Sequence, residues 1–150
     1  MYIDLHTHSV SSDDSRATVD QFVKWIGVLR RKGYQIDGFV LTEHRKFDFD
    51  VNYAELSAEN EVVILKGSEL DTDLGHFLVY GVNEELARRI DFGNVRLHAV
   101  ELVAAAEDTG AIAIPAHPGR PRIGFCEFSD QGIDFPGIQI VETLNGGSRK

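Results

Sequence analysis

The pair His6 and His8 is the first feature of the sequence whose residue types and spacing could do chemistry. The pair follows a short apolar segment around Tyr2 and Ile3 that predicts a strand, and side chains two residues apart point to the same face of a strand. Two imidazoles that project together from a strand end resemble half of a metal site. A His-x-His pair also occurs without a metal, so the prediction depends on further ligands elsewhere in the chain.

Further candidate ligands stand where other predicted strands end. The four apolar segments that predict these strands are Asp37–Thr42, Val62–Leu65, Ala111–Ile114 and Gly137–Val141. The ligand-type residues that follow them, in the same order, are His44, Glu69, His117 and Glu142. Strand ends converge on one face of a β/α barrel, and an open doubly wound sheet gathers them less tightly along one edge. Histidine and carboxylate ligands suit zinc, manganese and iron, and a carboxylate such as Glu69 can bridge two ions.

The remaining candidates each have an ordinary structural interpretation beside the functional one. Asp13 is compatible with a loop residue near the next helix, and Asp14 competes with it for any role in metal binding. His76 begins a predicted strand and is compatible with a histidine of the core. Arg120, in a Pro- and Gly-rich segment after a strand, suits a phosphate or carboxylate as well as a surface position. We assign no function to His98, which lies in a predicted helix.

Helices alternate with most of these strands. Thr18 and Gln21 match a capping box and predict a helix that ends at the basic segment before Gly33. Further helices are predicted at Tyr53–Glu59, Glu84–Ile90 and Leu97–Thr109, and one more strand at His76–Val82. Strands alternating with helices indicate βα units around a parallel sheet, and the short links predict one domain over residues 1–150.

Composition narrows the classes of partner and compartment. The chain has 150 residues and a formal net charge of −9, which argues against extended binding of nucleic acid. No apolar run approaches a membrane span, and no basic segment of a signal peptide follows Met1, so we expect a cytoplasmic protein without membrane contact. The single cysteine, Cys126, excludes an intrachain disulfide framework and is expected to be a small buried or loop residue.

Taken together, these motifs resemble the PHP (polymerase and histidinol phosphatase) family of metal-dependent phosphoesterases. The similar motifs occur in order along essentially the whole chain: Asp4-Leu5-His6-Thr7-His8-Ser9 with Ser12-Asp13, Thr42-Glu43-His44, Gly67-Ser68-Glu69, Gly75-His76-Phe77-Leu78-Val79-Tyr80-Gly81, Ala116-His117-Pro118-Gly119-Arg120 and Glu142-Thr143-Leu144-Asn145-Gly146. The resemblance implies a distorted (β/α)7 barrel with two to three divalent ions at its C-terminal face.

The resemblance also implies a role for each matched residue. It implies three ion sites: a first held by His6, His8 and Glu69, a second by Glu69, His76 and His117, and a third by Asp13 and His44. Arg120 would bind the phosphate of the substrate. A water bridging two ions would be the nucleophile, so no side chain needs to act as one.

The sequence departs from the family after Asn145. The family closes its site with an Asp-x-His on the last strand, and the printed sequence has no such motif between Asn145 and Lys150. From the sequence we therefore expect a PHP-type barrel that lacks its last strand or strands. Three explanations are open: a truncated chain, a nicked protein whose complementary C-terminal segment is a separate chain and a partner, or a genuinely shortened form, and the first two are favoured. An open edge beside Gly137–Val141 would otherwise expose unpaired backbone.

The main functional hypothesis is hydrolysis of a phosphate ester, whether a small phosphomonoester, a nucleotide or the end of an oligonucleotide. A metal-dependent amidohydrolase is the first alternative, because such enzymes also begin with His-x-His on a barrel strand. That alternative predicts a bridging lysine, and Lys66 is the only lysine near a strand end. A non-catalytic metal-binding module is the second alternative, since the Asp-x-His is absent.

Overall fold

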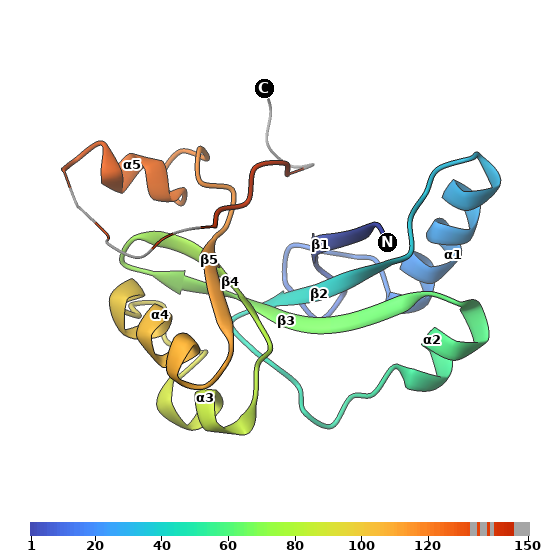
Figure 1. Ribbon diagram of the computed structural model, residues 1–150, viewed down its shortest axis with the longest axis horizontal. Coiled ribbons are helices and arrows are strands. Elements are labelled where there is room, and N and C mark those ends of the chain that lie inside the picture. Colours follow the sequence, from blue (N-terminus) through green and yellow to red (C-terminus); the bar gives the residue numbers. More distant parts are fainter. Residues whose placement is uncertain (133–134, 136–137, 139, 146–150) are drawn as a thin grey trace.

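The computed structural model describes residues 1–132, 135, 138 and 140–145, and its described strands form one sheet. The strands lie in the sheet in the order of the sequence: β1 (Ile3–Thr7), β2 (Gly38–His44), β3 (Val63–Thr72), β4 (Gly75–Tyr80) and β5 (Ile112–Pro115). Within the described residues, five helices flank the strands: α1 (Val19–Arg31), α2 (Ala54–Asn60), α3 (Glu84–Arg89), α4 (Ala99–Asp108) and α5 (Phe125–Ser129). Figure 1 shows α1 and α2 at one end of the sheet and α3 and α4 beside β4 and β5 at the other.

The sheet is mixed, and the expected (β/α)7 barrel is wrong. β1, β2 and β3 pair in parallel, whereas β4 is antiparallel to both β3 and β5. Only Asp73 and Leu74 separate β3 from β4. A parallel crossover requires a dozen or more residues, so a link of this length can only form a hairpin. The described strands therefore form a curled, mixed, five-stranded sheet with the shape of half a barrel.

The predicted last strand at 137–141 is not present among its described residues. Ile138, Ile140 and Val141 adopt no regular secondary structure. Gly137 and Gln139, which belong to the same prediction, lie outside the described residues.

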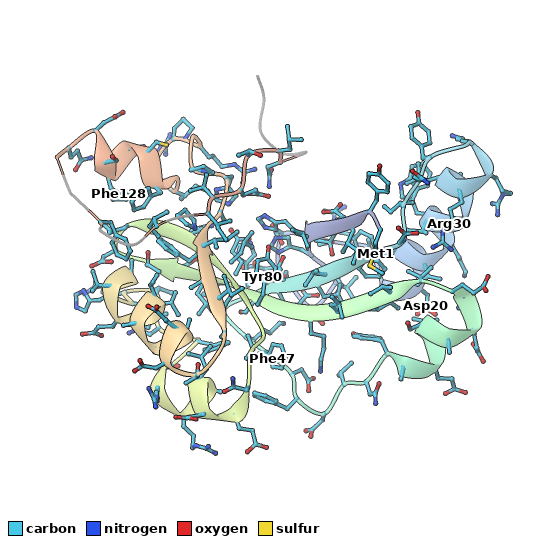
Figure 2. All side chains as sticks on the ribbon, in the orientation of Figure 1. Met1, Asp20, Arg30, Phe47, Tyr80 and Phe128 are labelled. Carbon is cyan, nitrogen blue, oxygen red and sulfur yellow. The ribbon has the colours of Figure 1, made fainter. Side chains whose placement is uncertain are left out.

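A hydrogen bond across the sheet reveals how strongly it curls. The Tyr80 hydroxyl, near the centre of Figure 2, donates to the Leu5 carbonyl of β1 at 3.0 Å. β4 and β1 are three strand positions apart in the sheet order, which is about 14 Å in a flat sheet. Because a tyrosine side chain is much shorter than that, the sheet must bend toward its inner face.

Two apolar cores hold the helices against the sheet. α1 buries Val23 and Ile26 against Phe39 and Leu41 of β2, and its Thr18 capping box is formed as predicted. The larger core joins β4 to α3 and α4 through Phe77, Val79, Leu86 and Leu102, among others. Since strand side chains alternate, Phe77 and Val79 point to the helices while His76, Leu78 and Tyr80 face the inner side.

The predictions of α1 to α4 are confirmed to within two residues at most ends. α5 has no counterpart among the predicted helices, and Cys126 within it is exposed rather than buried or in a loop. Within the described ranges, we find no helix with the length and apolar character needed to span a bilayer.

Candidate metal centre

The centre is built around Glu69, which lies within β3 rather than at its end. β3 continues to Thr72, so the strand is longer than the predicted Val62–Leu65 segment. Glu69 pairs in register with His44 of β2 and with Leu78 of β4. Its side chain points to the inner face and is only 1% exposed. A carboxylate in this position needs compensating partners, because burial of an unpaired charge is costly.

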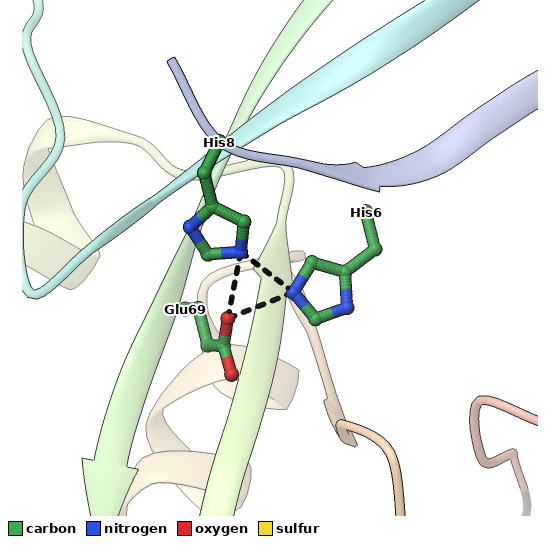
Figure 3. Close-up of side chains that lie close together, drawn as sticks. All are labelled: His6, His8 and Glu69. Carbon is green, nitrogen blue, oxygen red and sulfur yellow. Dashed lines mark hydrogen bonds and ion pairs between the residues drawn. The ribbon is translucent and has the colours of Figure 1, made fainter. Parts of the chain in front are cut away.

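Two histidines from the first strand and the loop after it surround one oxygen of this carboxylate (Figure 3). His6 Nε2 lies 2.7 Å and His8 Nε2 3.0 Å from Glu69 Oε2. The same two nitrogens are 2.9 Å apart. Three ligand-type atoms therefore converge on one point, as the spacing of His6 and His8 predicted.

Two other histidines surround the second oxygen of Glu69. His76 Nδ1 lies 2.7 Å and His117 Nε2 2.9 Å from Glu69 Oε1. His76 stands at the second residue of β4, and His117 follows the end of β5. Glu69 thus lies between two pairs of histidines, with one pair at each of its oxygens.

A third group of ligand-type atoms lies beside the first, and it contains Asp14 rather than Asp13. His8, Asp14 and His44 bring one ligand atom each to within 4.8 Å of one another. His44 Nε2 is 3.3 Å from Asp14 Oδ2. The side chain of Asp13 is 76% exposed and instead forms an ion pair with Arg45. The structure therefore brings six of the seven predicted ligands together and leaves Asp13 outside them.

The separations fit bound ions. Adjacent ligands of an ion about 2.1 Å from each donor lie roughly 3.0 Å apart in an octahedral site and about 3.4 Å apart in a tetrahedral one. The histidine nitrogens lie 2.7–3.0 Å from the Glu69 oxygens, close to the lower value. The contact between His6 Nε2 and His8 Nε2 also needs an explanation, since both point at the same oxygen. A cation shared by the two lone pairs and the carboxylate satisfies all three atoms at once. In addition, the buried Nδ1 of His117 has no hydrogen-bond partner among the described residues.

The close approach of histidines and carboxylates shifts the pKa values of Glu69 and His6 in the metal-free protein. Burial alone would raise the pKa of Glu69, but hydrogen bonds from the surrounding histidines outweigh it and hold that pKa far below the usual range. Burial alone would lower the pKa of His6, yet Glu142 and Glu69 together raise it to about 9. Without a metal, a proton on His6 thus helps to balance the buried carboxylates.

A cavity of about 460 Å³ opens over these side chains. Arg120 lines it together with the apolar Ile123 and Leu144, as well as the acidic Asp4. The Arg120 guanidinium donates to Asn145 Oδ1 at 3.1 Å, which holds the cation at the cavity. Arg120 therefore lies at the same cavity as the candidate ligands, and its predicted contact with a substrate phosphate stays a prediction.

Two further acidic residues lie at the centre. Glu142, a candidate at a predicted strand end for which the family resemblance implies no role, lies 3.0 Å from His6 Nδ1. Asp71 lies 3.3 Å from His76 Nε2. The available signal was its spacing, because residues two apart in a strand share a face and Asp71 follows Glu69 by two. His98 lies outside the centre, in an exposed ion pair with Asp73.

Comparison with known proteins adds no relative. No family model matches the chain, and no curated protein is significantly similar to it.

Proposed function

We propose that this protein is a metal-dependent phosphoesterase related to the PHP family. Its substrate would be a small phosphomonoester, a nucleotide or the end of an oligonucleotide. The observation that carries the proposal is the buried Glu69 carboxylate with two histidine nitrogens within 3.0 Å of each oxygen. A carboxylate flanked in this way suits a bridge between two divalent ions.

The chemistry divides between the ions and the chain. Two divalent ions close together would lower the pKa of a water, neutralise phosphoryl oxygens and stabilise the leaving oxygen. The chain's own part is to hold the ligands in place and to orient the substrate. Arg120 supplies a fixed guanidinium in the cavity, whose fork of donors matches a phosphate. Zinc, manganese and iron all suit the donor set, and a third ion would use His8, Asp14 and His44.

The size of the cavity supports a small substrate. At about 460 Å³ it lies near the lower end of the range for pockets that bind small molecules, which is roughly 300–1,000 Å³. A nucleoside monophosphate or the terminal nucleotide of an oligonucleotide is of this scale. The expected cytoplasmic location remains part of the proposal on the sequence evidence alone.

The amidohydrolase alternative receives less support. Its bridging lysine would have to reach the ions, but the Lys66 ammonium donates to the backbone carbonyls of Asp48 and Val51. Glu69 already occupies the position between the two histidine pairs. Cleavage of amides in the absence of phosphatase activity would reverse this preference.

Metal analysis together with a generic phosphatase assay tests the proposal. Purified wild type should retain two or three equivalents of zinc, manganese or iron and hydrolyse p-nitrophenyl phosphate. The double variant His6→Ala, His8→Ala should lose one or more ions and the activity. Glu84→Gln, which alters an exposed pair with Arg88, serves as the control and should behave as wild type. Tight binding of metal without turnover would favour the non-catalytic module, and a folded protein without metal would refute the proposal.

A further inference from the structure

Two of the four histidines around Glu69 have a second carboxylate within 3.3 Å of the ring nitrogen that faces away from it, and a third, His8, has Asp14 Oδ1 farther away, at 3.6 Å from its Nδ1. His6 presents Nε2 to Glu69 and Nδ1 to Glu142. His76 presents Nδ1 to Glu69 and Nε2 to Asp71. The two rings therefore use opposite nitrogens toward the centre. One of them lies at each oxygen of Glu69.

Glu142 is firmly held beside His6. Its Oε1 lies 3.0 Å from His6 Nδ1 and accepts a hydrogen bond from Asn145 Nδ2 at 3.0 Å. Its Oε2 accepts from the backbone N–H of His117 at 2.5 Å. The same carboxylate thus contacts residues from both histidine pairs, and its side chain is 10% exposed. These hydrogen bonds leave Glu142 little freedom to turn toward an ion.

Asp71 is held beside His76 by the strand pairing and by an arginine. Asp71 and His76 are direct partners in the register of β3 and β4. Asp71 Oδ1 lies 3.3 Å from His76 Nε2, and its Oδ2 lies 3.5 Å from the Arg45 guanidinium. Arg45 also contacts Asp13. The ladder of the hairpin fixes the relative positions of the two backbones, so the carboxylate is directed at the ring.

A carboxylate in this position selects one form of the ring. A neutral imidazole carries one proton, and the nitrogen that faces a carboxylate keeps it as a donor. The opposite nitrogen then offers its lone pair to a metal. Outer carboxylates of this kind orient metal-binding histidines, and their loss typically costs about 10- to 100-fold in metal affinity.

We propose that Glu142 and Asp71 are positioning residues that fix His6 with its proton on Nδ1 and His76 with its proton on Nε2. Each of the two ions proposed at Glu69 would then have one histidine ligand whose tautomer is fixed by an outer carboxylate. The inference rests on the proposed metal centre and adds to it the devices that prepare its two histidines. It also gives Arg45 and Asp13 a role in support of Asp71.

Direct ligation is the rival role for Asp71. Asp71, His44 and His76 each offer a ligand atom within 4.8 Å of the others, so the three could hold an ion among themselves. His76 would then turn Nε2 toward that ion while Nδ1 faces the centre. A ligand and a positioning residue differ in what their loss does to the number of bound ions, so stoichiometry separates the two roles.

Nitrogen NMR on the zinc-loaded protein tests the tautomers directly. Long-range proton–nitrogen correlation spectra of ¹⁵N-histidine-labelled protein distinguish a protonated, a free and a metal-bound ring nitrogen. His6 should show a proton on Nδ1 with Nε2 bound to zinc, and His76 should show the reverse. The opposite tautomer at either ring would overturn the assignment for that residue.

Metal affinity of matched variants provides the second test. Glu142→Gln and Asp71→Asn keep the shape of each side chain but remove its charge, and Glu84→Gln is the exposed control. Competition with a chelator should show zinc bound about 10- to 100-fold more weakly at one ion in each site variant. Thermal melts without metal verify that the variants fold. At saturating zinc the stoichiometry should remain that of wild type.

The outcomes separate this inference from the proposed function. Loss of one ion at saturation would make the altered residue a ligand and overturn its positioning role. Unchanged affinity and tautomers in variants of a zinc-binding protein would refute the inference and leave the proposed function standing. A wild type that binds no zinc, manganese or iron would refute both.

Discussion

The two halves of the sheet meet at β3 and supply the centre in different ways. The parallel half, β1 to β3, brings His6 and His8 to Oε2 of Glu69. The antiparallel half, β3 to β5, brings His76 and His117 to Oε1. Glu69 belongs to the strand that both halves share. Each half thus supplies one pair of candidate ligands, and one carboxylate joins the pairs.

The halves differ in how their side chains reach the same edge. β1 and β2 both run toward the centre, so His6, His8 and His44 come from strand ends and the residue just beyond. β4 runs the other way and begins where β3 ends, so His76 comes from the start of its strand. β5 runs in the direction of β3 again and places His117 after its end. An edge of a sheet can therefore gather ligands from strands of either direction.

The halves also differ in what supports them. The loop after β1 is held by polar contacts, in which Glu43 accepts from the Ser9 backbone N–H and from the Ser12 hydroxyl. The antiparallel half is supported by the larger apolar core that includes Phe77 and Val79. We therefore expect metal binding to depend on polar loop contacts in one half and on helix packing in the other.

Replacing the shared carboxylate should have the largest effect. Glu69→Gln removes the bridging charge from both halves, so both ions should bind more than about 100-fold more weakly. Phosphatase activity should disappear with them. Titration of metal into the apoprotein, detected by isothermal calorimetry, measures the change in affinity, with Glu84→Gln as the control. If one ion kept its wild-type affinity, Glu69 would serve only one half of the sheet.

Removing one pair of histidines should affect only the half that supplies it. His6→Ala with His8→Ala should abolish the ion at Oε2 and retain the one at Oε1, while His76→Ala with His117→Ala should do the reverse. Zinc stoichiometry by elemental analysis should fall by one in either variant if the third group stays empty. Loss of all metal in both variants would mean that the halves bind metal as one cooperative unit.

Without metal, the parallel half should lose stability as the pH rises. The pKa of His6 is raised to about 9 from its ordinary 6.5, so the folded state holds this proton more tightly than the unfolded chain. Its contribution is present in full below about pH 6.5 and is lost as the pH rises through about 9, a change of about 3 kcal/mol at most. Urea unfolding between pH 6 and 10 measures it.

A variant shows whether His6 causes this loss. In metal-free His6→Asn the free energy of unfolding should change much less over the same pH range. A decline as steep as that of wild type would assign the effect to another group. Bound zinc should also remove the decline, because the ion replaces the proton.

The sequence predicted which candidate ligands come together better than it predicted the sheet that carries them. A His-x-His pair after a strand, and acids or histidines after other strands, are local patterns. Such patterns do not depend on how the strands pair, so they held although the predicted topology was wrong. The prediction of a parallel sheet was wrong because strands alternate with helices along most of the chain but not between β3 and β4. Only two residues separate those two strands, which forces a hairpin.

Other features depended on contacts between distant segments. Asp14 rather than Asp13 approaches His44 because of the path of the loop after β1, which adjacent acids of equal type do not reveal. The pairing of Glu142 with His6 joins residues 136 positions apart. Neither feature has a local sequence signal. Asp71, in contrast, could have been found from its spacing to Glu69 on one face of a strand.

The smallest predicted effect comes from a substitution in the turn between β3 and β4. It tests whether the antiparallel half keeps its metal affinity when a contact far from Glu69 is lost. Asp73, in the turn between β3 and β4, accepts a hydrogen bond from the Ala99 backbone N–H at the start of α4 and pairs with His98. Asp73→Ala should therefore lower the free energy of unfolding by about 1 kcal/mol, as the loss of a helix cap does. Zinc affinity should stay at the wild-type value, because among the described residues neither Asp73 nor α4 belongs to the groups of possible ligands. A weaker ion at Oε1 in this variant would show that the turn and the helix position His76.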